Sequence, residues 1–275
     1  MIFVKGSGWM CNNILQYGHF YAWGREHGRE TMSMRFAYKF QFFRICDTKH
    51  HNFLTYTIAK YAAKWGLFPT LAFNEEGADI TAQEQEMLRH KHIAVVGWEA
   101  RWYDLFLKYK SEIIDLFAFK PSVVKACEPL LAETTGGSCR LGVHIRRGDY
   151  AEWKHGIYCY DDETYANYIR QFADLFPNKT ISVALATNDP ALSAKQYRKL
   201  LGNDKRIQVY LLRGNAVEDL FMLSECDYII GPPSTYSLVA AMYRDMPLCR
   251  IDQVKDGRLS LSDFKLFDYW FRRIL

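Results

Sequence analysis

LGVHIRRGDY, at residues 141–150, is the stretch of this 275-residue sequence around which its fold can be predicted. The first half is typical of a buried strand, because Leu141, Val143 and Ile145 alternate with two other residues. The second half, Arg-Arg-Gly-Asp, is polar and turn-prone. Ligands of open α/β sheets bind at the carboxyl ends of strands, and two guanidiniums there suit a phosphate. The alternative is a surface turn with a local Arg–Asp pair.

A regular alternation of strands and helices follows that stretch. The apolar patterns predict strands at 141–145, 181–186, 207–211, 228–230 and 248–251, with helices between them. Strands separated by helices imply a parallel sheet with helices on both faces. The polar, glycine-rich segment TTGGS at 134–138 is the best candidate for a domain boundary. We therefore expect an α/β protein with domains at 1–135 and 139–275 and a cleft between them.

The composition limits the classes of partner. Hydrophobic residues make up 49% of the chain, and the net charge of +4 is mild and scattered, which argues against nucleic acid. No apolar run reaches the ~20 residues that cross a bilayer, although contact with a membrane surface stays open. None of the seven cysteines forms a C-x-x-C pair, so neither a zinc site nor a disulfide framework is indicated. A reducing, cytoplasmic location is expected.

Three strand ends are expected to meet at one edge of the second sheet. Asn188 follows the strand at 181–186. Ser234 and Thr235 stand where a helix begins, so their hydroxyls and the free backbone N–H groups suit a phosphate, with plain N-capping as the alternative. Asp219 either accepts hydrogen bonds from a base or ribose, or simply occupies the first turn of a helix. Together with residues 146–149, these positions predict a nucleotide diphosphate site.

Four segments resemble one enzyme family. HIRRGDY at 144–150 is similar to the H-x-R-R-G-D-Y signature of the α-1,2-fucosyltransferases, which belong to a wider group with α-1,6- and protein O-fucosyltransferases. The supporting segments, in the family's order, are GSGWMCNNILQYGHFYAWGREHG at 6–28, ALATNDP at 184–190 and EDLFMLSECDYIIGPPSTYSLVAA at 218–241. The resemblance implies a GT-B fold with two Rossmann-like domains. It also implies an inverting transfer of L-fucose from GDP-fucose to a glycan, in α-1,2 linkage, without a metal or other cofactor.

The resemblance also implies roles for the residues of the signature. Arg146 would hold the β-phosphate of GDP as a catalytic residue, and His144 would lie beside it. Arg147 would brace the site through Asp149. Acceptor activation needs at most one carboxylate base, for which Asp149, Glu152 and an unassigned acid of the N-terminal half are the candidates.

Outside the signature, the resemblance assigns the remaining contacts to the second domain. Ser234 and Thr235 would bind phosphate, Asp219 would contact the nucleoside, and Asn188 is counted among the substrate-binding residues. No residue is assigned to a metal. The first domain, 1–135, is expected on the acceptor side.

The chain departs from the family pattern at two places, which leaves the acceptor and the linkage open. Leu238-Val239 replaces the usual Trp-Trp after the last motif serine, and Trp9-Met10-Cys11 is inserted in the opening loop. A lipid-linked glycan at the inner face of the membrane is among the compatible acceptors. Two other functions stay open: a transferase that uses another GDP-sugar, and a non-catalytic protein that binds a nucleotide sugar.

Overall fold

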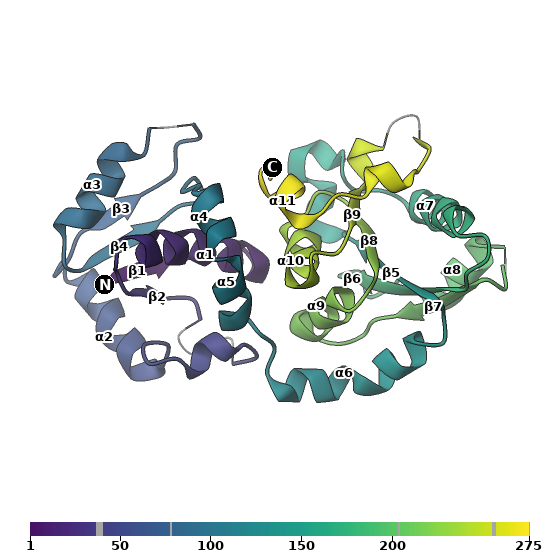
Figure 1. The fold of residues 1–275 in the computed structure, drawn as a ribbon, viewed down its shortest axis with the longest axis horizontal. Helices are drawn as coiled ribbons and strands as arrows, with labels where there is room; N and C mark the ends of the chain where they lie inside the picture. Colours follow the sequence, from purple (N-terminus) through teal and green to yellow (C-terminus); the bar gives the residue numbers. More distant parts are fainter. Residues whose placement is uncertain (37–40, 78, 203, 255–256, 275) are drawn as a thin grey trace. The chain divides into compact units, whose positions relative to one another are not determined.

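The computed structural model describes residues 1–36, 41–77, 79–202, 204–254 and 257–274. The chain divides into two compact units, Met1–Lys120 and Pro121–Leu275. Each unit is built on one parallel sheet, four-stranded in the first and five-stranded in the second (Figure 1). The predicted α/β class with two parallel-sheet layers is confirmed.

Unit 1 has the strand order β2-β1-β4-β3, with every neighbouring pair parallel. Its strands are β1 (Ile2–Lys5), β2 (Thr31–Ser33), β3 (Thr70–Ala72) and β4 (Ile93–Val96). Its helices are α1 (Met10–Glu26), the short 3₁₀ helix η1 (Arg44–Asp47), α2 (Phe53–Lys64), α3 (Thr81–Arg89), α4 (Tyr103–Lys108) and α5 (Lys110–Leu116). Helix α1 is buried over most of its length. Its own hydrophobic residues therefore lie on all sides of the helix and do not form a single stripe.

Unit 2 has the strand order β7-β6-β5-β8-β9, again with every neighbouring pair parallel. Its strands are β5 (Cys139–Ile145), β6 (Ile181–Thr187), β7 (Ile207–Leu211), β8 (Tyr228–Gly231) and β9 (Leu248–Arg250). Its α-helices are α6 (Pro121–Thr134), α7 (Asp162–Leu175), α8 (Ala194–Leu200), α9 (Ala216–Ser224), α10 (Thr235–Arg244) and α11 (Phe267–Phe271). The short 3₁₀ helices are η2 (Gly148–Ala151), η3 (Trp153–Gly156), η4 (Ile251–Gln253) and η6 (Leu261–Asp263).

The division between the units falls at Pro121, before α6. The Cys127 thiol of α6 donates to the carbonyl of Glu218 in α9 over 3.7 Å, so this helix packs within unit 2. The glycine-rich segment at 134–138, predicted as the boundary, is instead the turn that joins α6 to β5 inside unit 2.

Strand β5 lies at the centre of unit 2 and is buried on both faces. Leu141, Val143 and Ile145 pack into the core with side chains of α7 such as Phe172. On the other face, a Cβ at Gly142 would come within 2.8 Å of Leu223 in α9, so the absent side chain lets the helix approach. The alternation seen in the sequence therefore places the apolar residues of β5 against α7 and Gly142 against α9.

The described residues contain neither a membrane-spanning helix nor a disulfide bond. Among the described residues, no helix combines the length and the apolar character that crossing a bilayer requires. All seven cysteines are free thiols.

Gly97 offers a test of the packing in unit 1. It follows β4 with φ +124°, and a Cβ there would overlap the carbonyl oxygen of Phe73, which accepts a hydrogen bond from the Glu99 N–H over 3.0 Å. Gly97→Ala should lower the melting temperature by roughly 6 °C or more, because strain and a backbone clash add. Gly28 has φ +63° with open space around its Cβ position, so Gly28→Ala should lose only about 3 °C. Equal losses in thermal unfolding would contradict the clash.

Candidate functional site

The candidate site lies where the strand order of unit 2 reverses. The chain runs from β5 outward through β6 to β7, and then returns to the opposite side of β5 as β8. In open α/β sheets, ligands bind beside the carboxyl ends of the strands at such a switch point. Ile145 pairs with Thr187 and Val143 pairs with Ile230, so the segments after β5, β6 and β8 start side by side. The predicted meeting of these three strand ends is confirmed.

Arg146, the first residue after β5, lies on the open side of this edge. Its Nη2 donates to Asp149 over 2.8 Å, and its guanidinium carbon is 5.5 Å from the centroid of the Tyr150 ring. Gly148 has φ +65°, a left-handed conformation that suits glycine and turns the chain between Arg146 and Asp149. The Asp149 side chain is half exposed, so this ion pair is partly screened by water. A guanidinium has five N–H donors, and this carboxylate uses one of them.

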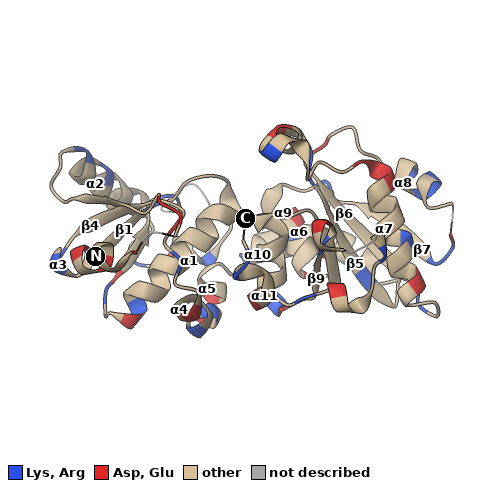
Figure 2. Cartoon of the chain, turned by 90° about the horizontal axis from the view of Figure 1, so that it is seen from above, with Lys and Arg blue, Asp and Glu red and all other residues tan. Residues whose placement is uncertain are grey.

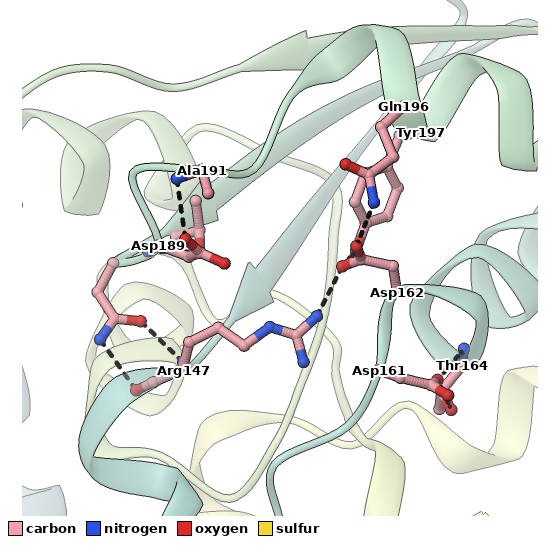
Figure 3. Close-up of polar contacts among 10 residues, drawn as sticks. Arg147, Asp161, Asp162, Thr164, Asp189, Ala191, Gln196 and Tyr197 are labelled. Atoms are coloured by element: carbon pink, nitrogen blue, oxygen red, sulfur yellow. Dashed lines mark hydrogen bonds and ion pairs between the residues drawn. The ribbon is translucent and has the colours of Figure 1, made fainter.

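Arg147 points in the opposite direction, into the helical layer. Its Nη2 donates to Asp162 over 2.6 Å, at the first residue of α7. Asp162 also accepts from the Tyr197 hydroxyl over 2.9 Å and from the Gln196 amide over 2.7 Å. Figure 3 shows the Arg147 guanidinium directed at the Asp162 carboxylate, with Tyr197 and Gln196 on its other side.

The expectation that Arg147 pairs with Asp149 is wrong. The backbone at Arg147 is extended, with φ −123° and ψ −164°, and consecutive side chains of an extended chain point to opposite sides. Arg146 therefore takes Asp149, while Arg147 takes Asp162. Arg147 does brace the loop, but it does so through a carboxylate on a neighbouring helix.

Asn188, at the end of β6, also braces this loop. Its amide oxygen accepts from the Arg147 backbone N–H over 2.8 Å, and its amide nitrogen donates to the Arg147 carbonyl over 3.0 Å. The oxygen and the nitrogen of the Asn188 side-chain amide thus both hold the backbone after β5 against the end of β6. Its contribution to a ligand site is through the position of this backbone.

His144 lies beneath the site and is buried and neutral. Burial, with the charge of Arg146 as a second cause, lowers the pKa of His144 to about 3. The ring centroid is 5.0 Å from that of Tyr236 in α10. Its Nδ1 has no hydrogen-bond partner among the described residues, and a buried polar atom in that state normally finds a ligand or water.

The segment after β8 places a helix N-terminus beside the Arg146 loop. Ser234 is the N-cap of α10, and its Oγ accepts from the Tyr236 N–H over 3.2 Å. The capping interpretation is therefore correct for Ser234, and it uses the hydroxyl oxygen as an acceptor while the hydroxyl proton can still be donated. Thr235 follows as the first helical residue. The Tyr150 hydroxyl donates to the Pro233 carbonyl over 2.6 Å, which ties the Arg146 loop to this N-terminus.

Asp219 stands in the first turn of α9, after an Asn215 capping box. Its Oδ1 accepts from the Gly214 N–H over 3.0 Å. Burial is the main cause that raises the pKa of Asp219 to about 7, with the Gly214 hydrogen bond acting against it. The carboxyl is thus poised between its neutral and charged forms near neutral pH.

Three residues near the site were not predicted from the sequence as parts of it: Asp162, Tyr150 and Arg250. Arg250 ends β9, is 6% exposed, and pairs with Asp252 over 2.9 Å. The sequence contained a signal for Arg250. An Arg at a strand end followed closely by an Asp occurs at 250–252, as it does at 146–149. Among the described residues, no group of three or more His, Cys, Asp or Glu side chains is placed to hold a metal ion.

The chain is similar to solved structures over nearly its whole length. A variant of Arabidopsis thaliana FUT1 in complex with GDP has a TM-score of 0.68 at 10% identity, covering 96% of this chain and 73% of that one. The fucosyltransferase NodZ from Bradyrhizobium has a TM-score of 0.55 at 14% identity, covering 92% and 96%. POFUT1 in complex with GDP-fucose has a TM-score of 0.53 at 10% identity, covering 89% and 93%. These likenesses establish a GT-B-like fold.

Sequence comparison identifies the family. No curated protein matches the chain. The profile described as glycosyl transferase family 11 matches residues 78–245, which is more than half of the sequence and includes the segments after β5, β6 and β8. The chain therefore belongs to glycosyl transferase family 11 and is a glycosyltransferase.

Proposed function

We propose that this glycosyltransferase transfers L-fucose from GDP-fucose to a hydroxyl of a glycan, in α-1,2 linkage and with inversion at the fucose C1. The observation that carries the proposal is the Tyr150–Pro233 hydrogen bond, because it holds two anion-binding elements together. These elements are the Arg146 guanidinium and the N-terminus of α10, which suit a diphosphate between them. FUT1 and POFUT1, which share the fold, have been solved with GDP and GDP-fucose, respectively.

The donor site follows from these contacts. Arg146 binds the β-phosphate, and Ser234 and Thr235 donate to the diphosphate from the start of α10. His144, neutral in its buried position, offers its unpaired Nδ1 to the same group. Asp219 contacts the nucleoside. Arg147 and Asn188 act by holding the loop after β5 in place.

The chemical step needs negative charge to be stabilised on the leaving group. The acceptor hydroxyl oxygen attacks C1 of fucose, the bond from C1 to the β-phosphate oxygen breaks, and its electron pair stays on GDP. A fixed guanidinium and helix-terminal N–H groups stabilise that charge as it develops, so the step is proposed to proceed without a metal.

The acceptor proton goes to a carboxylate, for which we propose Asp149 with Glu152 as the alternative. Asp149 is the present partner of Arg146, and a diphosphate that replaces it would release this carboxylate.

Activity and metal dependence can be tested together. The chain should transfer fucose from GDP-fucose to members of a glycan array, and the rate should persist in EDTA. Binding of GDP-fucose without transfer to any acceptor would point to a non-catalytic protein. Faster transfer from another GDP-sugar would contradict the donor assignment. Loss of activity on chelation, restored by Mg²⁺ or Mn²⁺, would contradict the metal-independent step.

The two arginines provide a matched pair of variants. Arg146→Ala should lower the transfer rate by roughly 10²-fold or more with little change in the melting temperature of the free protein, because its ion pair is partly screened. Arg146→Lys should recover little, since an ammonium lacks the planar fork of donors. Arg147→Ala should lower the melting temperature by several degrees, because Asp162 loses a charged partner at a part-buried site. Near-normal transfer by Arg146→Ala would remove the central residue of the proposal.

Asp219 predicts a pH dependence of donor binding. Its raised pKa means that its contribution to the stability of the free protein is complete below the unfolded value of 3.8 and is lost as the pH rises through about 7. The charged form is the better acceptor for nucleoside N–H or O–H groups. GDP-fucose should therefore bind more tightly as the pH rises from 6 to 8, by up to about tenfold.

Asp219→Asn is the control for this effect. It keeps an oxygen for the Gly214 N–H, so the free protein should stay as stable as the wild type at pH 8. The affinity of this variant for GDP-fucose, measured by calorimetry, should be lower than that of the wild type and should not change between pH 6 and pH 8. The same pH dependence in both proteins would show that Asp219 does not contact the nucleoside.

A further inference from the structure

Helix α2 carries its large apolar side chains on the side that faces solvent. Leu54, Ile58 and Trp65 are 69%, 62% and 69% exposed, and Tyr61 is 42% exposed. Their spacing of i, i+4, i+7 and i+11 places them on one stripe of the helix. We call these four residues the α2 stripe. Phe53 and Leu67, at the two ends of the helix, are also more than half exposed.

The side of α2 that packs on unit 1 carries the partly buried ring of Tyr56 beside a smaller group. Ala59 is the buried residue of the helix, and it lies in a small cluster with Phe3, Met32 and Ala94. A helix of a globular protein usually turns its apolar stripe to the core and its polar side to water. In α2 a further apolar stripe faces water. An exposed apolar surface of this kind marks a contact with a partner or a membrane.

The charge around the α2 stripe is of one sign. Between residues 48 and 74 the sequence contains Lys49, Lys60 and Lys64 and no Asp or Glu. Figure 2 shows α2 with basic positions and no acidic ones. The acidic neighbours Asp47 and Glu30 have partners of their own, with Asp47 2.7 Å from the Lys120 ammonium and Glu30 3.5 Å from the His50 ring.

Lys60 and Lys64 are exposed, one turn apart on the same helix, and the Lys60 ammonium is 5.9 Å from the Tyr61 ring centroid. Lysines in this position can keep their charge at a membrane surface while their methylene stems cover the apolar stripe. Tryptophan and tyrosine, which have an apolar body and a polar edge, are enriched at the same depth. Apolar and aromatic side chains flanked by lysines are the features of a helix that lies in the plane of a bilayer surface.

We propose that α2 is a peripheral membrane-binding helix, which inserts the α2 stripe among the acyl chains of an anionic phospholipid surface and places Lys60 and Lys64 at its headgroups. The positive charge distinguishes this occupant from a second copy of the chain, because two copies would bring the same lysines together. The proposal does not depend on the donor or acceptor assigned above, since it rests on unit 1 alone.

The test is co-sedimentation of the full chain with vesicles of phosphatidylcholine alone or with about one-third phosphatidylglycerol. The wild type should bind the anionic vesicles clearly more tightly, and salt should weaken the binding. Lys60→Glu with Lys64→Glu should lower the partition coefficient at least tenfold, since each lysine near an anionic surface contributes about a fivefold factor. Leu54→Ser with Ile58→Ser should lower it about tenfold or more, through loss of buried apolar surface.

Matched controls come from unit 2. Lys195→Glu with Lys199→Glu makes the same charge change at the same spacing on α8, at exposed positions. Leu261→Ser with Leu266→Ser removes two other exposed leucines. Both controls should bind vesicles like the wild type. All variants change exposed residues, so melting temperatures near the wild-type value should accompany the binding data.

Three outcomes would overturn the proposal. The first is a wild type that does not sediment with anionic vesicles. The second is equal binding to neutral and anionic vesicles, or binding that the α2 variants do not weaken beyond the controls. The third is a concentration-dependent dimer, seen by analytical ultracentrifugation, that Leu54→Ser with Ile58→Ser dissociates while the wild type ignores vesicles. That result would make a second copy of the chain the occupant of the α2 stripe.

Discussion

The candidate site depends on the extended backbone that links β5 to Gly148. Because the chain is extended at Arg147, its side chain and that of Arg146 point to opposite sides of the strand end. One guanidinium is fixed in the helical layer by Asp162, while the other stays at the open edge of the sheet. The Asn188 amide holds the backbone between them. Two adjacent, chemically identical residues thus form ion pairs on opposite sides of the strand end.

Burial sets the charges of the groups around Arg146. His144 is neutral because it is buried beside a guanidinium, and burial raises the pKa of Asp219 to about 7. The positive charge of Arg146 is consequently not cancelled by a fully buried carboxylate; its partner Asp149 is half exposed. An anionic ligand that displaces Asp149 would exchange a screened ion pair for a two-pronged contact with less water around it.

The two units are built on the same type of parallel sheet, but they differ in where their large apolar side chains lie. In unit 2, β5 is covered on both faces, and the large apolar side chains are inside. In unit 1, α2 packs on the core through Ala59 and Tyr56 and leaves a further set of large apolar residues outside. Hydrophobic burial within the chain therefore does not account for the residues of the α2 stripe. Their exposure as one continuous stripe is the physical basis of the membrane proposal.

The sequence by itself determined the parallel α/β architecture of unit 2, because five apolar runs separated by capped helices have few other ways to bury their surface. It also determined which strand ends meet, since parallel strands present their carboxyl ends at one edge. The family resemblance implied Asp149 as the partner of Arg147, and local composition favoured the TTGGS turn as the domain boundary. The tertiary structure decided otherwise, because the direction of a side chain depends on the backbone twist and its partner can come from another helix. Likewise, the contact of α6 with α9 joins residues far apart in the chain, so composition marks the turn at 134–138 but only packing shows which unit α6 belongs to.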